Sequence, residues 1–132
     1  MRYLLNTNIL SALIRFPAGA VPGRVRSIGE AAICTSTVAA AELRSGAARR
    51  GSPRLAAQVE GLLSQFDVLP LEPPADATYA SLRARLEREG PPIGANDLLI
   101  AAHALTLGHT LVTDNEREFR RIRQLTVENW LR

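Results

Sequence analysis

Short apolar segments alternate along the chain with longer stretches whose apolar residues recur at helical spacing, and this alternation limits the possible folds more than any other feature. The apolar segments cover residues 2–5, 31–35, 66–71 and 110–113, and 125–128 is a candidate fifth. Helical stretches are expected at 7–14, at 37–48, after 53 with an apolar stripe from 55 to 66, at 75–86 and at 95–107. Strands that alternate with helices favour a parallel sheet covered on both faces. We therefore expect an α/β fold, a three-layer α/β/α domain with a central parallel sheet of four to five strands.

The length and charge of the chain restrict its class without identifying its function. A chain of 132 residues is expected to form a single domain spanning 1–132. All 16 basic residues are Arg, and with 13 acidic residues they give a formal charge of +3. The planar Arg fork suits phosphate groups, so a nucleic-acid partner is compatible with this composition. Codon bias in a GC-rich genome would equally explain the absence of Lys.

Compartment signals favour a cytoplasmic protein. No apolar run approaches the roughly 18 to 20 residues that a membrane span requires, and Asn6-Thr7-Asn8 interrupts the apolar start before it resembles a signal peptide. Cys34 is the only cysteine, so no disulfide can form within the chain.

Oxygen-bearing side chains follow three of the expected strands and begin one of the expected helices. They are Asn6, Asn8, Glu42, Asp97, Asp114, Asn115, Glu116 and Glu118. Ligands of parallel sheets bind beyond the carboxyl ends of the strands, where these residues should meet. Asp97 is the most informative, because its helix is otherwise apolar and Asp is rarely buried without a partner. Each residue also has an ordinary interpretation, such as a helix-start charge for Asp97 or a turn former for Asp114.

Clustered carboxylates indicate a cation. Their mutual repulsion raises their pKa values unless a cation joins them, and hard oxygen ligands suit Mg²⁺ or Mn²⁺. Such an ion can polarise a phosphoryl oxygen, deprotonate a water, or act as one of a pair that clamps both sides of a phosphodiester.

Four stretches of the sequence carry a family resemblance. They are residues 2–13 (RYLLNTNILSAL), 40–46 (AAELRSG), 93–104 (IGANDLLIAAHA), and 111–115 (LVTDN) with its continuation through 118–119 and 127–131. In order and spacing these stretches resemble VapC toxins, which are ribonucleases with the PIN-domain fold. The resemblance implies a Mg²⁺-dependent endoribonuclease, the toxin of a type II toxin–antitoxin system paired with a VapB-type antitoxin. It further implies an RNA substrate, a homodimer within a larger toxin–antitoxin assembly, and binding to operator DNA only through the antitoxin.

The resemblance also suggests which residues form the site, with one departure. It places catalytic and metal-binding roles on Glu42, Asp97, Asp114 and position 6, where the family has an acidic residue and this chain has Asn6. An amide keeps a carbonyl acceptor but loses the negative charge, so metal affinity and water activation should fall. Our hypothesis is that Asn6 is an engineered inactivation that makes a toxic protein easier to produce; a natural loss of activity is the alternative. Asn115 and Glu118 are alternatives to Asp114.

Two other functions remain open from the sequence, as do the roles of several arginines. With Asn6 the chain could act only as a binding protein for antitoxin and RNA, or it could be another Mg²⁺-dependent phosphohydrolase. One group of arginines either contacts RNA phosphates or lies on a solvated helix face: Arg117, Arg120, Arg121 and Arg123. A second group could contact RNA, pair with acidic residues of the antitoxin, or do neither: Arg44, Arg49 and Arg50. His103, Cys34 and Trp130 are interpreted as packing residues.

Overall fold

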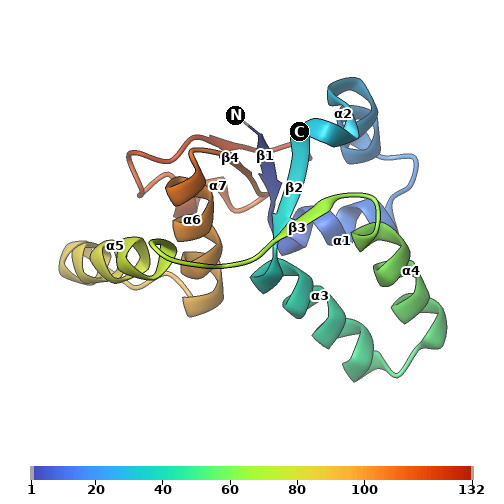
Figure 1. Ribbon diagram of the computed structural model, residues 1–132, viewed down its shortest axis with the longest axis horizontal. Coiled ribbons are helices and arrows are strands. Elements are labelled where there is room, and N and C mark those ends of the chain that lie inside the picture. The colour runs from blue at the N-terminus through green and yellow to red at the C-terminus, as the bar shows by residue number, and fades with distance from the viewer. Residues whose placement is uncertain (1, 132) are drawn as a thin grey trace.

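The computed structural model describes residues 2–131 and has a central sheet of five parallel strands. The strands are β1 (Tyr3–Leu5), β2 (Ile33–Ser36), β3 (Asp67–Leu69), β4 (Thr110–Val112) and β5 (Val127–Glu128). Their order in the sheet is β3-β2-β1-β4-β5, with β1 in the middle (Figure 1). The predicted α/β class and the fifth strand are therefore confirmed.

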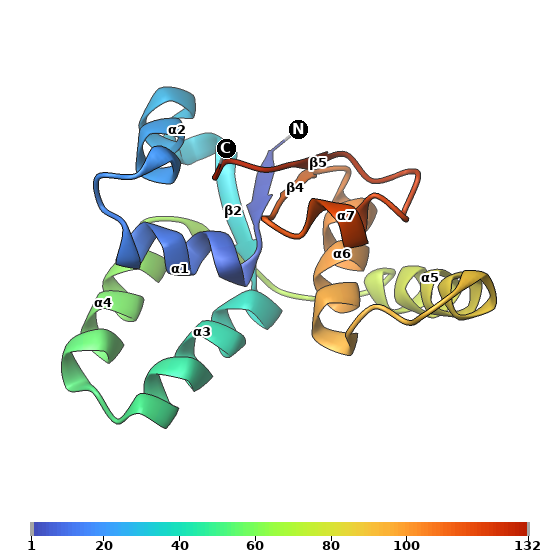
Figure 2. The same ribbon diagram turned by 180° about the vertical axis from the view of Figure 1, so that it is seen from behind.

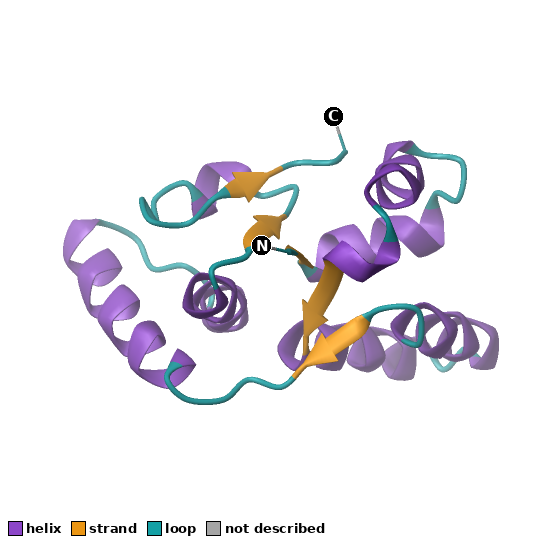
Figure 3. Cartoon of the chain, turned by 45° about the horizontal axis from the view of Figure 1, so that its top comes forward, coloured by secondary structure: helices purple, strands orange, loops and turns teal. Residues whose placement is uncertain are grey.

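Helices cover both sides of this short sheet. They are α1 (Thr7–Arg15), α2 (Ala20–Ile28), α3 (Thr37–Arg50), α4 (Pro53–Leu63), α5 (Ala75–Glu89), α6 (Ala95–Leu107) and α7 (Glu116–Phe119). Helices α1, α3 and α4 lie on one side of the strands, and α5 and α6 lie on the other (Figures 1 and 2). Figure 3 shows how short the strands are relative to the helices around them. Among residues 2–131, no helix is long and apolar enough to cross a membrane.

The core explains why the strands lack an alternating pattern. Leu4 and Leu5 of β1 and Ile33 and Cys34 of β2 are all fully buried, as expected where both faces of a sheet are covered. Trp130 is also buried, and its ring centroid lies 5.3 Å from that of Tyr3. The interpretation of Cys34 and Trp130 as packing residues is thus confirmed.

Capping side chains and a glycine mark the ends of three helices. The Ser36 side chain accepts a hydrogen bond from the Val38 N–H at the start of α3, and Ser52 accepts one from the Leu55 N–H at the start of α4. Gly108 ends α6 in the left-handed conformation, with φ of 72°.

Two segments differ from the sequence prediction. The Pro and Gly content of residues 17–23 predicts a loop, but α2 begins at Ala20. Pro22 lies in its first turn, where the missing N–H costs no intrahelical hydrogen bond. The apolar stripe was expected to run to Phe66, but helix α4 ends at Leu63. Phe66 is buried outside the helix.

Candidate active site

Asn6 and Thr113 meet at the carboxyl ends of the two central strands. β1 and β4 are in parallel register with Leu5 opposite Val112, and the Asn6 N–H donates to the Val112 carbonyl at 2.9 Å. The Asn6 side chain then accepts from the Thr7 N–H at 2.8 Å and donates through Nδ2 to Thr113 Oγ1 at 3.0 Å. Both side chains are buried, so the orientation of the Asn6 amide is determined on both of its sides.

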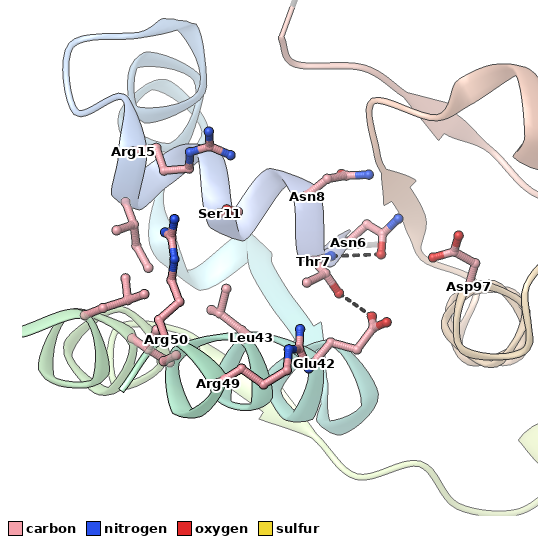
Figure 4. Close-up of a pocket in the computed structure, with 15 residues that line it drawn as sticks. Asn6, Thr7, Asn8, Ser11, Arg15, Glu42, Leu43, Arg49, Arg50 and Asp97 are labelled. Atoms are coloured by element: carbon pink, nitrogen blue, oxygen red, sulfur yellow. Dashed lines mark hydrogen bonds between the residues drawn. The ribbon is translucent and has the colours of Figure 1, made fainter. Parts of the chain in front are cut away.

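Asp97 lies in the first turn of α6, beside Asn6 and opposite α3 (Figure 4). Burial raises the pKa of the Asp97 carboxyl above its ordinary value, and the negative charge of Glu42 adds to this shift. Glu118 and, more weakly, Asp114 raise the pKa further, while a hydrogen bond with the Asn6 side chain lowers it. Glu42, Glu118 and Asp114 therefore lie near enough to Asp97 for their charges to act on its carboxyl.

Glu42 is held by two neighbouring helices. Its Oε1 accepts a hydrogen bond from Thr7 Oγ1 at 2.6 Å, and its Oε2 accepts one from Asn96 Nδ2 at 3.2 Å. Thr7 begins α1 and Asn96 begins α6, so Glu42 connects both helices to α3. The sequence analysis did not identify Thr7 or Asn96 as site residues. The sequence signal that could have found them is their position next to Asn6 and Asp97.

The segment after β4 approaches this cluster less closely than the sequence suggested. The Asp114 N–H donates to Asn8 Oδ1 at 3.4 Å, and the Asn115 N–H donates to Thr113 Oγ1 at 3.1 Å. The side chains of Asp114 and Asn115 are exposed. Glu118 affects the pKa of Asp97 more strongly than Asp114 does. The identity of the fourth acidic residue therefore stays a prediction, with Asp114 and Glu118 both near.

An open groove of about 660 Å³ runs between α1, α3 and α4 and reaches this cluster. Asn6, Glu42 and Asp97 lie at one end, and Arg15, Arg49 and Arg50 line the rest of its rim (Figure 4). Its apolar part is formed by Ile14, Leu43, Ala47, Leu55 and Val59. The groove can therefore receive a ligand that is both charged and partly apolar.

The oxygen donors present do not complete a site for a divalent cation. Among residues 2–131, no group of three or more His, Cys, Asp or Glu side chains is placed to hold a metal ion. Glu42 and Asp97 face the same end of the groove, and the third position is occupied by Asn6. Its Nδ2 is a hydrogen-bond donor, which repels a cation. The expected effect of the Asn6 departure is thus consistent with the geometry.

The other sequence candidates have structural partners. His103 is buried, with Nδ1 2.9 Å from Ser36 Oγ, and burial followed by the charge of His109 lowers its pKa. Ion pairs engage four of the candidate arginines with carboxylates: Arg44 with Glu60, Arg120 with Glu116, Arg121 with Glu118, and Arg123 with Glu89. His103 is therefore a packing residue, and the solvated-face interpretation suits these four arginines.

Comparison with known proteins agrees with this fold and site. The PIN domain family model matches residues 3–125, which include every residue of the acidic cluster. The chain is 37% identical to ribonuclease VapC2 of Haemophilus influenzae over 99% of both chains, and 36% identical to the tRNA(fMet)-specific endonuclease VapC of Shigella flexneri over 98% of both. A solved structure of DNA-bound VapBC from Salmonella typhimurium superimposes with a TM-score of 0.92 at 34% identity, covering 98% of each chain. The fold is that of a PIN domain. Within that class, the chain belongs to the VapC family.

Proposed function

We propose that this chain is the toxin component of a type II toxin–antitoxin system, with a fold built to hydrolyse RNA phosphodiesters. We further propose that the hydrolysis depends on Mg²⁺, or on Mn²⁺ in its place, and that Asn6 impairs it in this chain. The observation that carries the proposal is the convergence of Glu42 and Asp97 on the side chain at position 6, at one end of an open groove.

RNA is the proposed substrate class because of the relatives that the whole chain matches. Two of them are named a ribonuclease and a tRNA(fMet)-specific endonuclease. The groove itself is consistent with a polyanion, since three arginines line it beside the acidic end. A tRNA is accordingly the first substrate to test.

The residues of this chain have distinct roles in the proposed activity. Glu42 is oriented by Thr7 and Asn96, so its carboxylate is preorganised toward the groove. The half-buried Asp97 supplies a second carboxylate whose charge is unfavourable without a cation. A divalent cation, when bound, would polarise the phosphodiester and favour deprotonation of a water. With Asn6 the donor set lacks one carboxylate, and we therefore expect weak metal binding.

The proposed partners are a VapB-type antitoxin and a second copy of the chain. The solved relatives include VapBC complexes from Salmonella typhimurium and Rickettsia felis, each with DNA bound. By analogy, this chain would form a homodimer within a larger toxin–antitoxin assembly and would contact operator DNA only through the antitoxin.

Restoring the carboxylate at position 6 tests the proposal. The Asn6→Asp variant and the unchanged chain would be incubated with tRNA and Mg²⁺, with EDTA as the control for metal dependence. We expect cleavage by the variant that EDTA abolishes, together with Mg²⁺ affinity raised by more than about tenfold in calorimetry. Adding Glu42→Gln to the Asn6→Asp variant should remove the cleavage, because the site then again lacks one of its carboxylates.

The possible results separate the proposal from its alternatives. Equal inactivity of both proteins, with unchanged Mg²⁺ affinity, would show that position 6 is not the missing ligand and would favour a binding protein. Equal cleavage by both would show that Asn6 does not impair the chain. Hydrolysis of a phosphomonoester such as p-nitrophenyl phosphate in place of RNA would indicate another phosphohydrolase.

A further inference from the structure

We propose that Arg15, Arg49 and Arg50 form a phosphate-binding track along which single-stranded RNA reaches the acidic end of the groove. This inference deepens the proposed function and rests on it. It assigns RNA contact to the groove between α1, α3 and α4 and not to the arginines that follow β4.

The three arginines share the groove with the candidate active site. Arg15 lies in the last turn of α1, and Arg49 and Arg50 end α3. In Figure 4 the Arg50 side chain extends from α3 toward Arg15, and the Arg49 side chain extends along α3 toward Glu42. Arg49 also lines a second hollow on the other side of Glu42. The track therefore continues directly into the acidic end of the groove.

The charges of these arginines are not neutralised. The ion pairs among residues 2–131 involve other arginines. Arg49 Nη1 donates to the neutral Ser45 Oγ at 2.7 Å, and the Arg15 guanidinium lies 5.7 Å from the Phe16 ring centroid. Both contacts leave the positive charge uncompensated, and all three side chains are exposed. A phosphate can bind them without first breaking an ion pair.

Three arginines of the face after β4 lack this property. There, Arg120 and Arg121 each lie within 4.0 Å of a glutamate of the same segment, and Arg123 lies 4.0 Å from Glu89. A phosphate approaching that face would meet negative charge beside each of these three arginines. For Arg120, Arg121 and Arg123 these ion pairs favour the solvated-face interpretation over RNA contact.

The shape and lining of the groove favour a single RNA strand as the occupant. Guanidinium groups bind phosphate through two parallel N–H donors. The partly exposed apolar side chains of Ile14 and Leu55 in the groove offer a surface for unstacked bases, and unstacked bases are available in the loops and ends of RNA. An acidic protein segment is the competing occupant, and the experiment below distinguishes it.

Two triple variants with the same change in charge test the track. The groove variant replaces Arg15, Arg49 and Arg50 with Gln, and the matched control replaces Arg117, Arg120 and Arg123 with Gln. Binding of fluorescent single-stranded RNA and of tRNA is measured by anisotropy in EDTA, over a series of salt concentrations. We expect weaker binding only for the groove variant. Its slope of log K against log salt should be smaller by about 2, since each lost contact with single-stranded RNA contributes about 0.7.

Several results would overturn the track. Equal losses in the two variants would show a general charge effect, and a larger loss in the control would return RNA contact to the face after β4. Unchanged RNA affinity of the groove variant, with weakened binding of a VapB-type antitoxin, would assign the arginines to a protein partner. Failure of the unchanged chain to bind RNA at all would instead contradict the proposed function. Unfolding in urea, equal for the three proteins, confirms that each variant is folded.

Discussion

The Asn6 side-chain amide donates to Thr113 Oγ1 at 3.0 Å, which joins the residue after β1 to the residue after β4. Thr113 Oγ1 also receives hydrogen bonds from Asn8 Nδ2 at 3.4 Å and from the Asn115 N–H at 3.1 Å. One buried hydroxyl therefore organises both segments that deliver side chains to this end of the sheet. It explains how a strand-end threonine outside the acidic cluster can influence the site.

Replacing Thr113 with Val should destabilise the protein. The variant keeps the shape of the side chain but leaves the buried Asn6 amide without its acceptor, at a cost of about 1–3 kcal/mol in the free energy of unfolding. Urea denaturation measures the change. Thr126→Val is the control, because Thr126 is exposed, and its effect should stay within about 0.5 kcal/mol. A Thr113→Val protein as stable as the control would mean that the hydroxyl does not hold these segments.

Stability should fall as the pH drops below about 6.5. Burial is the main cause that lowers the pKa values of both His103 and His109 in the folded protein. Below the pKa that these histidines have in the unfolded chain, the unfolded chain therefore binds more protons than the folded chain, and protonation favours unfolding. Well above that pKa both states are unprotonated and the effect vanishes. Urea midpoints between about pH 7.5 and 5.5 should show this loss.

Proton NMR provides a direct check, since the chain contains only 2 histidines. Both ring signals should titrate with midpoints below about 6.5. A midpoint for His103 at or above that value would contradict its burial beside Ser36.

Gly46→Ala should stabilise the protein, in contrast to Gly108→Ala. Gly46 is inside α3, and a Cβ there would meet only Arg49 Nη2, at 4.0 Å. Ala is favoured over Gly in a helix interior by about 0.5–1 kcal/mol. Gly108 has φ of 72°, a left-handed conformation that costs a side chain about 1 kcal/mol or more. Thermal unfolding of the two variants should move the midpoint in opposite directions, and a shift in the same direction would refute this account.

Cys34 should not react with thiol reagents in the folded protein. The side chain is fully buried in β2, and burial raises the pKa of its thiol to about 11. The reactive thiolate is therefore scarce and inaccessible near neutral pH. Labelling with a chromogenic disulfide reagent should be slow in buffer and complete in denaturant. Fast labelling of the folded protein would show that β2 opens readily.

Much of the fold could be predicted because its signals are local. Alternating strand and helix patterns, the Ser36 and Ser52 caps and the glycine at 108 each depend on residues within a few positions of one another. Helix α2 was missed because Pro22 and Gly23 are typical of loops, yet buried Val21 and Val25 hold the helix against the rest of the protein. Local propensity is weak enough for such tertiary packing to override it.

The sequence by itself determined the order of most elements, the family and the presence of an amide at position 6, where the resemblance implies a carboxylate. Only the tertiary structure decided which side chains cooperate. It placed Thr7 and Asn96 on Glu42, 35 and 54 positions away along the chain. It also paired Arg120, Arg121 and Arg123 with glutamates, while Arg15, Arg49 and Arg50 have no carboxylate partner among residues 2–131. Such contacts depend on how helices pack around a parallel sheet. No local sequence pattern reports this packing, because the residues in contact are far apart along the chain. The charge of a side chain can be read from the sequence, but what neutralises that charge depends on the folded chain.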